Sequence, residues 1–241
     1  ETYKVIAPLW YPEKAVAVFF SPGSNPRGEI IVEKRTTEAR ACYSNEESRD
    51  LILTNTNKIS EDRVVNFPIR FISSKNPIIR NRYSILVKQY VESLAAHTFH
   101  ETLKKISNNG SILSQTQPGF LYGNIKSVDN PGEKVIGFFN VSFCSEKRLF
   151  FNFEDVLPNI QRPNFQYDCP YVDPLAPANP YIFNYCFTPG PNCQGDLILD
   201  FIQSGNRVLV DYIGTKYTLY PTECGDCTSF SSNIKPSFWI D

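Results

Sequence analysis

The sequence predicts a mostly β protein built from antiparallel sheets, in a sandwich or barrel-like arrangement, with one packed α-helix near residues 93–109. Short runs of β-branched and aromatic residues recur between clusters of Gly, Pro and Asn. Aromatic residues make up 14% of the chain and there are 18 prolines, which is typical of a loop-rich β protein. Hydrophobic residues, at 41%, provide enough apolar area for a core. We therefore expect a single β-rich domain over residues 1–241.

The predicted strands are short and closely spaced. They lie at residues 3–9, 15–20, 29–34, 50–56, 63–72, 82–91, 134–143, 148–153, 196–202 and 207–213. Short polar spacers predict two hairpins, one joining 134–143 to 148–153 and one joining 196–202 to 207–213. Between Tyr83 and Val91, apolar and polar residues alternate, which predicts one buried face and one wetter face.

One helix is predicted directly after that strand. Ser93 is a suitable N-cap and Gly110 a suitable C-terminal stop. Apolar residues recur between them at helical spacing: Ala96, Phe99, Leu103 and Ile106. We expect Phe99 and Leu103 to be buried against the sheet that contains residues 83–91.

Residues 154–193 form a long excursion rich in proline and aromatic residues. The segment has 8 of the 18 prolines and almost no periodicity. It carries seven aromatic residues: Phe165, Tyr167, Tyr171, Tyr181, Phe183, Tyr185 and Phe187. A loop cannot bury that much aromatic area against itself, so the segment either folds back over its own sheet or faces a partner. Because tyrosine suits a surface that is dry only when bound, we expect the seven residues to face a partner or ligand.

The seven cysteines predict disulfides and an oxidising compartment. They are Cys42, Cys144, Cys169, Cys186, Cys193, Cys224 and Cys227, and five of them lie in Pro- and Gly-rich segments near the end of the chain. The odd number leaves at least one thiol free. We expect this to be Cys144, packed as a small hydrophobe inside an apolar strand.

The turn between Cys186 and Cys193 contains Pro189 and Gly190, and we expect these two cysteines to form a bond. Cys224 and Cys227 stand in a C-x-x-C pair, which is found in structural disulfides, zinc sites and redox dithiols. The segment that follows is turn-rich and has no histidine, which favours structural disulfides. We expect Cys169 to bond one member of the pair and Cys42 the other.

No enzymatic motif stands out, and we expect no catalytic activity, no cofactor and no metal. The nucleophile-elbow, zinc-protease and phosphate-loop patterns are missing. His97 and His100, with Glu101, offer a weak set of metal ligands on the predicted helix, but a packed or solvated histidine is the more frequent outcome. Four acidic residues in the second half of the chain are the remaining candidates for a glycosidase pair: Asp168, Asp173, Asp196 and Asp200.

The charge and hydropathy of the chain argue against nucleic acid as a partner and against a transmembrane helix. A net charge of -1 gives no electrostatic attraction to phosphate backbones, so nucleic acid is not expected. The sequence has no apolar run of 18 residues and hence no transmembrane helix. The chain opens at Glu1 without a signal peptide, and we interpret it as the C-terminal part of a longer protein.

Several strings carry a family resemblance. They are SEDRVVNFPIRFIS (60–73), RYSILVKQY (82–90), GSILSQTQPGFLYGNIKSVDNPGEKVIGFFNVS (110–142), EKRLFF (146–151), ECGDC (223–227) and KPSFW (235–239), with ETYKVIAPL (1–9) as a similar start. Together they resemble an outer-membrane lipoprotein family of the Bacteroidota, known as domain of unknown function 4249. Cys144, Cys186 and Cys193 depart from the family pattern, which makes the 154–193 excursion particular to this chain.

The resemblance implies a cell-surface protein held at the outer membrane by a lipid anchor. It implies a lipoprotein signal and an immunoglobulin-like domain ahead of this region, and no established activity. The leading functional hypothesis is an accessory binding subunit of a TonB-dependent transporter. A structural subunit of a larger outer-membrane secretion or assembly complex is the first alternative, and an enzyme that acts on surface glycans or peptides is the second.

Overall fold

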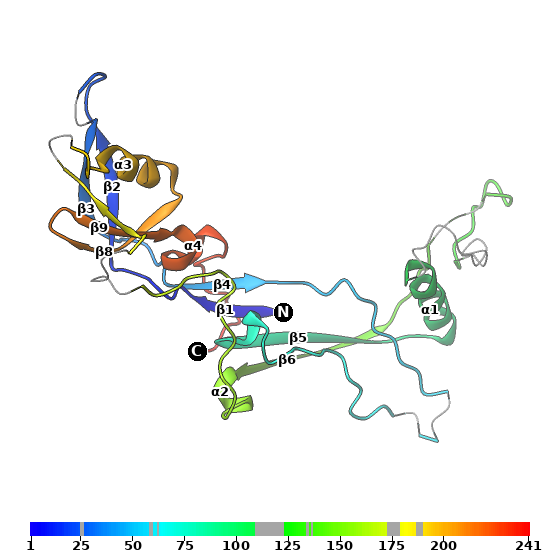
Figure 1. The fold of residues 1–241 in the computed structure, drawn as a ribbon. Coiled ribbons are helices and arrows are strands. Elements are labelled where there is room, and N and C mark those ends of the chain that lie inside the picture. The colour runs from blue at the N-terminus through cyan, green and yellow to red at the C-terminus, as the bar shows by residue number, and fades with distance from the viewer. Residues whose placement is uncertain are drawn as a thin grey trace. The chain divides into compact units, whose positions relative to one another are not determined.

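The fold is mostly β, with three antiparallel sheets and a few helices, as predicted (Figure 1). The computed structural model describes residues 1–24, 27–57, 60–61, 63–108, 123–133, 135, 137–172, 179–186 and 190–241. The chain divides into two compact units. Unit 1 comprises residues 1–46, 73–84 and 150–241, and unit 2 comprises residues 47–72 and 85–149. The boundary between them falls inside β5 (Arg82–Val91) and β6 (Phe143–Asn152).

A four-stranded sheet begins in unit 1, with the strand order β4-β1-β5-β6. β1 (Thr2–Ile6) pairs along its whole length with β4 (Ala41–Asn45), from Thr2 opposite Asn45 to Ile6 opposite Ala41. β4 was not predicted. On its other side β1 pairs with β5 only where Thr2 faces Ser84 and Tyr3 faces Tyr83. The 3-10 helix η1 (Pro77–Ile79) precedes β5, and the short helix α2 (Phe153–Val156) follows β6.

A second core in unit 1 joins a small sheet, a helix and a hairpin. The sheet has the order β7-β9-β8, from β7 (Ile182–Asn184), β9 (Lys216–Pro221) and β8 (Arg207–Ile213). Helix α3 (Gly195–Ser204) and the hairpin of β2 (Glu13–Phe19) and β3 (Gly28–Lys34) pack against it. The buried members of this core are Phe183, Tyr185, Ile198, Leu209, Tyr217 and Leu219.

Helix α3 replaces the strand predicted at residues 196–202. The run DLILDFI fits both periods, but as a helix it places Ile198 and Leu199 in the core, where both are fully buried. Asp196 and Asp200 lie one helical turn apart, and both pair with Arg27 of the hairpin, at 3.1 and 2.8 Å. The predicted hairpin with residues 207–213 is therefore wrong, and β8 pairs with β9 instead.

Three other predicted strands are coil where the structure describes them. They are residues 50–56, 63–72 and most of 134–143, of which Lys134 and Ile136 lie outside the described residues. A strand needs a hydrogen-bonded neighbour, and no described strand pairs with these segments. Their apolar residues are consequently exposed, as with Leu51, Ile52 and Val65.

Unit 2 contains the predicted helix as α1 (Leu94–Asn108). The Ser93 hydroxyl accepts a hydrogen bond from the Ala96 amide at 3.2 Å, and the Ser93 carbonyl accepts one from His97 at 2.9 Å, so Ser93 is the N-cap. The predicted packing is wrong for Leu103, which is 42% exposed, while Phe99 is half-buried and packs on Phe138, with ring centroids 5.2 Å apart. Beyond Ser84, β5 has only β6 as a described neighbour, and two strands offer no broad buried face for the helix.

The position of Leu103 predicts a small effect of truncation. Leu103→Ala should lower the free energy of unfolding by less than about 1 kcal/mol, whereas Leu199→Ala should lower it by about 2–5 kcal/mol because Leu199 is fully buried. Urea denaturation of the two variants measures the difference. Equal losses would mean that α1 is packed as tightly as α3.

The C-terminal segment is held to the four-stranded sheet by Trp239 and Asp241. The Trp239 ring is buried, with its centroid 5.1 Å from that of Tyr43 and 5.8 Å from that of Phe150. The Asp241 carboxylate accepts hydrogen bonds from Lys235 and Lys4, at 2.5 and 3.1 Å. These bonds lower the pKa of Asp241 from 3.8 to about 2.

Acidification should loosen this segment. Because the pKa of Asp241 is lower in the folded protein, its ion pairs are fully stabilising above pH 3.8 and are lost as the pH falls through about 2. In a Trp10→Phe background, the Trp239 fluorescence should shift to the red across that interval. Asp241→Asn should abolish this pH dependence; an unchanged transition in the variant would assign it to other carboxyl groups.

Candidate functional site

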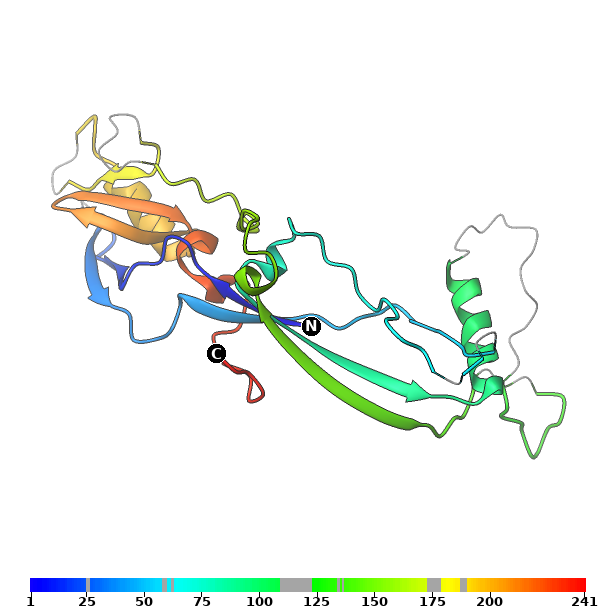
Figure 2. The same cartoon turned by 90° about the horizontal axis from the view of Figure 1, so that it is seen from below.

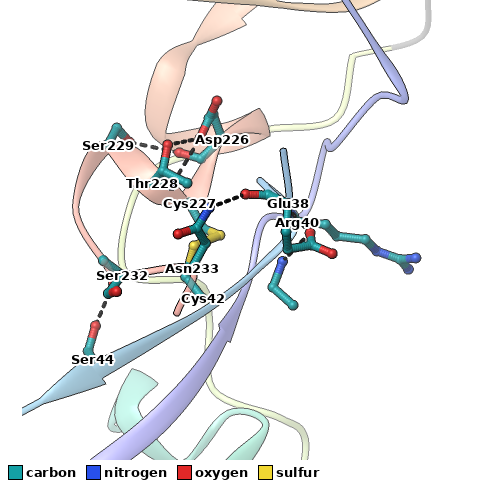
Figure 3. The surroundings of a disulfide bond; sticks show 12 residues. Glu38, Arg40, Cys42, Ser44, Asp226, Cys227, Thr228, Ser229, Ser232 and Asn233 are labelled. Carbon is teal, nitrogen blue, oxygen red and sulfur yellow. Dashed lines mark hydrogen bonds between the residues drawn. A yellow bond between two sulfur atoms is a disulfide. The ribbon is translucent and has the colours of Figure 1, made fainter. Parts of the chain in front are cut away.

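The C-x-x-C turn joins distant parts of unit 1. Cys42 bonds Cys227 with a sulfur–sulfur distance of 2.02 Å (Figure 3). Cys169 bonds Cys224 with a distance of 2.06 Å. Helix α4 (Thr222–Gly225) carries Cys224, and the 3-10 helix η2 (Cys227–Ser229) carries Cys227. These are the two distant partners expected from the sequence. With each cysteine in its own disulfide, the turn holds neither a redox dithiol nor thiolate ligands for zinc.

Asp226 lies between these two half-cystines and ties the turn to the chain ahead of β4. Its carboxylate accepts a hydrogen bond from Arg35 at 2.9 Å, and the Arg35 side chain is only 8% exposed. The other carboxylate oxygen accepts from the backbone N–H of Thr228 at 2.9 Å, which caps η2 (Figure 3). We call residues 224–227, with Arg35, the disulfide node. Its contacts account for the motif as a structural element.

The remaining cysteines differ from prediction. Cys186 and Cys193 are free thiols, not the predicted bond. The backbone does bring them together, but the Cys193 thiol points to the Cys186 carbonyl at 3.6 Å. A hydrogen bond between the two thiols raises the pKa of Cys186 and lowers that of Cys193. Cys144 is free, as expected, but exposed rather than packed in an apolar strand, because the end of β6 that carries it is exposed.

The aromatic residues of the 154–193 excursion mostly pack against their own unit. Phe183 and Tyr185 are core residues, 6% and 4% exposed, so the prediction that they face a partner is wrong. Their burial depends on α3 and on the β2–β3 hairpin, whose Gly28 carbonyl accepts the Tyr185 hydroxyl at 2.5 Å. Tyr181 stacks on Tyr220 with ring centroids 4.1 Å apart.

The other described aromatic residues of the excursion differ in their exposure to solvent. Phe165 and Tyr167 cluster with Phe230, with centroid distances of 4.9–6.1 Å, although Tyr167 remains partly exposed. Tyr171 is exposed and remains available to a partner. Phe187 lies outside the described residues. The excursion therefore follows the alternative considered from the sequence, in which it folds back over its own unit.

One of the histidines and two of the acidic residues singled out from the sequence have charged partners. His100 Nδ1 lies 2.9 Å from the Glu92 carboxylate, while the buried Nε2 of His97 has no hydrogen-bond partner in the part of the chain that the structure describes. No group of three described His, Cys, Asp or Glu residues is placed to hold a metal, including the set of His97, His100 and Glu101. Asp196 and Asp200 are occupied by Arg27, and Asp173 lies outside the described residues.

Unit 1 offers little room for a small ligand. The best-formed hollow found among its described residues holds about 10 Å³, roughly the space of one water molecule. It is lined by Tyr3, Lys4, Val5, Pro77, Arg80, Asn81, Phe165 and Gln166. Small-molecule sites are commonly 300–1,000 Å³, so this hollow is not one.

Unit 2 exposes an unusual amount of apolar surface. Its described residues include one buried hydrophobic side chain, that of Ala96. Five large apolar side chains in the same unit are each 69–93% exposed: Phe71, Val128, Phe139, Val141 and Phe143. We call these five the apolar set. Single exposed apolar residues are ordinary, but a unit that exposes most of its large apolar side chains points to an interaction surface.

Sequence reasoning did not single out the apolar set. Its members lie in segments interpreted as buried strand or near them, so their apolar character was assigned to a core. The available signal was weak: residues 63–72 have no predicted hairpin partner, and the predicted partner of 134–143, residues 148–153, belongs largely to the same strand, β6, as Phe143. The structure leaves these segments without a described strand beside them.

Comparison with known protein families gives one match. The model of the Domain of unknown function (DUF4249) family matches residues 3–148. The chain belongs to this family. The DUF4249 match includes nearly all of unit 2 and β1 to β5, while residues 224–227 of the disulfide node and Trp239 lie beyond it. No curated protein and no solved structure matches the chain.

Two further observations bear on where this DUF4249 protein resides. Its two disulfides indicate folding in an oxidising, extracytoplasmic compartment. None of the described helices is both long and apolar enough to cross a membrane.

The disulfide node yields a prediction at Gly225. An added Cβ at this position would lie 2.7 Å from Val208 Cγ1 and 3.2 Å from the Leu9 carbonyl oxygen. Gly225→Ala should therefore lower the free energy of unfolding by about 1–3 kcal/mol, although alanine is the better helix former. Gly190→Ala is the matched control, because no atom of the described residues lies within 4 Å of its added Cβ. Thermal or urea denaturation of both variants tests this; a stabilised Gly225→Ala would contradict the packing at the node.

Proposed function

We propose that this DUF4249 chain is a non-catalytic binding domain at the cell surface, whose second unit attaches it to an outer-membrane transporter. The observation that carries the proposal is the apolar set of unit 2, in a unit whose described residues bury only Ala96 among hydrophobic side chains. Folded proteins gain stability by removing such surface from water, at about 25 cal/mol per Å². A partner that covers the set supplies this gain.

The partner is a protein rather than a small molecule. The exposed apolar residues of unit 2 are distributed over the two-stranded ribbon of β5 and β6, helix α1 and coil. Such an extended surface suits a protein interface, which buries about 800 Å² per side. Ligand sites are concave, and the best hollow found in the described residues of unit 1 has room for only one water molecule.

The cell compartment narrows the choice of partner. Disulfides place the protein outside the cytoplasm, and the resemblance to outer-membrane lipoproteins supports attachment through a lipid outside residues 1–241. The same resemblance supports a TonB-dependent transporter as the partner. In this role, unit 1 would be a disulfide-braced body and unit 2 the docking element.

Paired substitutions on unit 2 test the proposal. The full-length protein, extracted from its native outer membrane in mild detergent, should co-elute with a TonB-dependent transporter. Val141→Ser with Phe143→Ser should reduce the recovered transporter at least tenfold, because both side chains would be buried in the interface. The melting temperature of the free protein should change little, because both residues are exposed in the free protein.

Ile213→Ser with Ile234→Ser is the matched control, because these two side chains of unit 1 are similarly exposed, at 66% and 75%. This variant should retain the transporter. Equal recovery of transporter with both pairs would contradict docking through unit 2. Recovery of a secretion or assembly machine in place of a transporter would favour the structural-subunit hypothesis.

A further inference from the structure

β5 is paired on both sides over only part of its length. Near its start, Tyr83 and Ser84 face β1 on one side, while β6 neighbours the strand on the other. From Ile85 to Val91 the strand continues beside β6, as Figures 1 and 2 both show. Among the described residues, no strand pairs with this part of β5 on the β1 side. We call Ile85–Val91, on that side, the open edge.

An open edge has a specific chemical requirement. Every second residue directs its backbone N–H and C=O away from β6, at the repeat of a β ladder. Another extended chain satisfies this row of donors and acceptors, whereas a helix or a lipid chain does not. Two strands alone are only marginally stable in water, so a third strand on this edge would also stabilise the two-stranded pairing of β5 with β6.

The outer edge of β6 in the same ribbon differs in composition. Between Phe143 and Leu149 it carries the charged run Glu146, Lys147 and Arg148, the type of sequence that protects an edge from pairing. The open edge of β5 has one charge, Lys88, and five apolar residues. The Lys88 ammonium lies 3.1 Å from the Glu146 carboxylate, so β6 already compensates it. Of the two edges, that of β5 is the unprotected one.

We propose that the open edge of β5 receives an extended strand from the partner protein, which pairs with Ile85–Val91 on the side opposite β6. This inference rests on the proposed function and specifies how the partner docks. Backbone hydrogen bonds hold the added strand in register. Its side chains lie beside those of β5, where Tyr90 and Val91 are exposed, so an apolar strand is the chemistry that fits.

Amide hydrogen exchange at residue resolution tests the inference. The comparison is between the free protein and the complex purified from the native outer membrane in mild detergent. Alternate amides between Ile85 and Val91 should exchange at least tenfold more slowly in the complex. The amides of Glu146 and Lys147 serve as the internal control, and the one directed away from β5 should exchange equally fast in both samples.

The two proposals fail in different ways. If no partner co-elutes, the proposed function is wrong. If a partner co-elutes but the amides of the open edge exchange as in the free protein, docking by strand addition is wrong while the proposed function stands.

A pair of proline variants gives an independent readout. Leu86 and Val87 are consecutive, so one directs its N–H to β6 and the other to the open edge. Proline at the position whose N–H points to β6 should destabilise the free protein, because it removes a hydrogen bond between β5 and β6. Proline at the other should leave the free protein folded and reduce the recovered partner at least tenfold. Full recovery of the partner with that folded variant would overturn the inference.

Discussion

Unit 1 depends on the disulfide node more than on any single hydrophobic cluster. Cys227 holds β4 through Cys42, and Cys224 holds the 154–193 excursion through Cys169. The bonded cysteines are 185 and 55 residues apart, so closing the two loops lowers the entropy of the unfolded chain and, in the loop-entropy model, raises its free energy by about 5 and about 4 kcal/mol. A nearly buried ion pair, Arg35 with Asp226, is stable at this point because the node excludes water and fixes its geometry.

The disulfide node helps to explain the order of the described part of the 154–193 excursion, which has little regular structure. Cys169 fixes its middle, Phe165 and Tyr167 pack on Phe230 just beyond η2, and its end forms β7 beside β9. Each contact is made to a segment more than 30 residues away in the sequence. The described part of the excursion therefore depends on the rest of unit 1 for its order, and most of its aromatic residues pack within that unit.

Sequence reasoning succeeded where the signal is local or covalent. Ser93 marked the start of α1, the run at residues 82–91 marked β5, and the separation of Cys224 from Cys227 by two residues favoured distant disulfide partners. It failed where the outcome depends on distant partners. The run DLILDFI is amphipathic at both the helical and the strand period. Arg27 lies opposite Asp196 and Asp200, an arrangement that suits a helix and cannot be read from the sequence. The burial of Phe183 likewise requires α3, which was predicted as a strand.

The two units are both rich in apolar residues but differ in how much of them they bury. Unit 1 buries or half-buries most of its aromatic residues and braces them with disulfides, and the best-formed hollow found among its described residues has room for one water molecule. Unit 2 has similar residues, with Cys144 as its free cysteine, and leaves the apolar set in water. Such exposure is costly for an isolated protein and favourable for one that functions in a complex, because the same side chains stabilise the interface once they are covered. The exposed apolar set is therefore the feature of unit 2 that the proposed binding function requires.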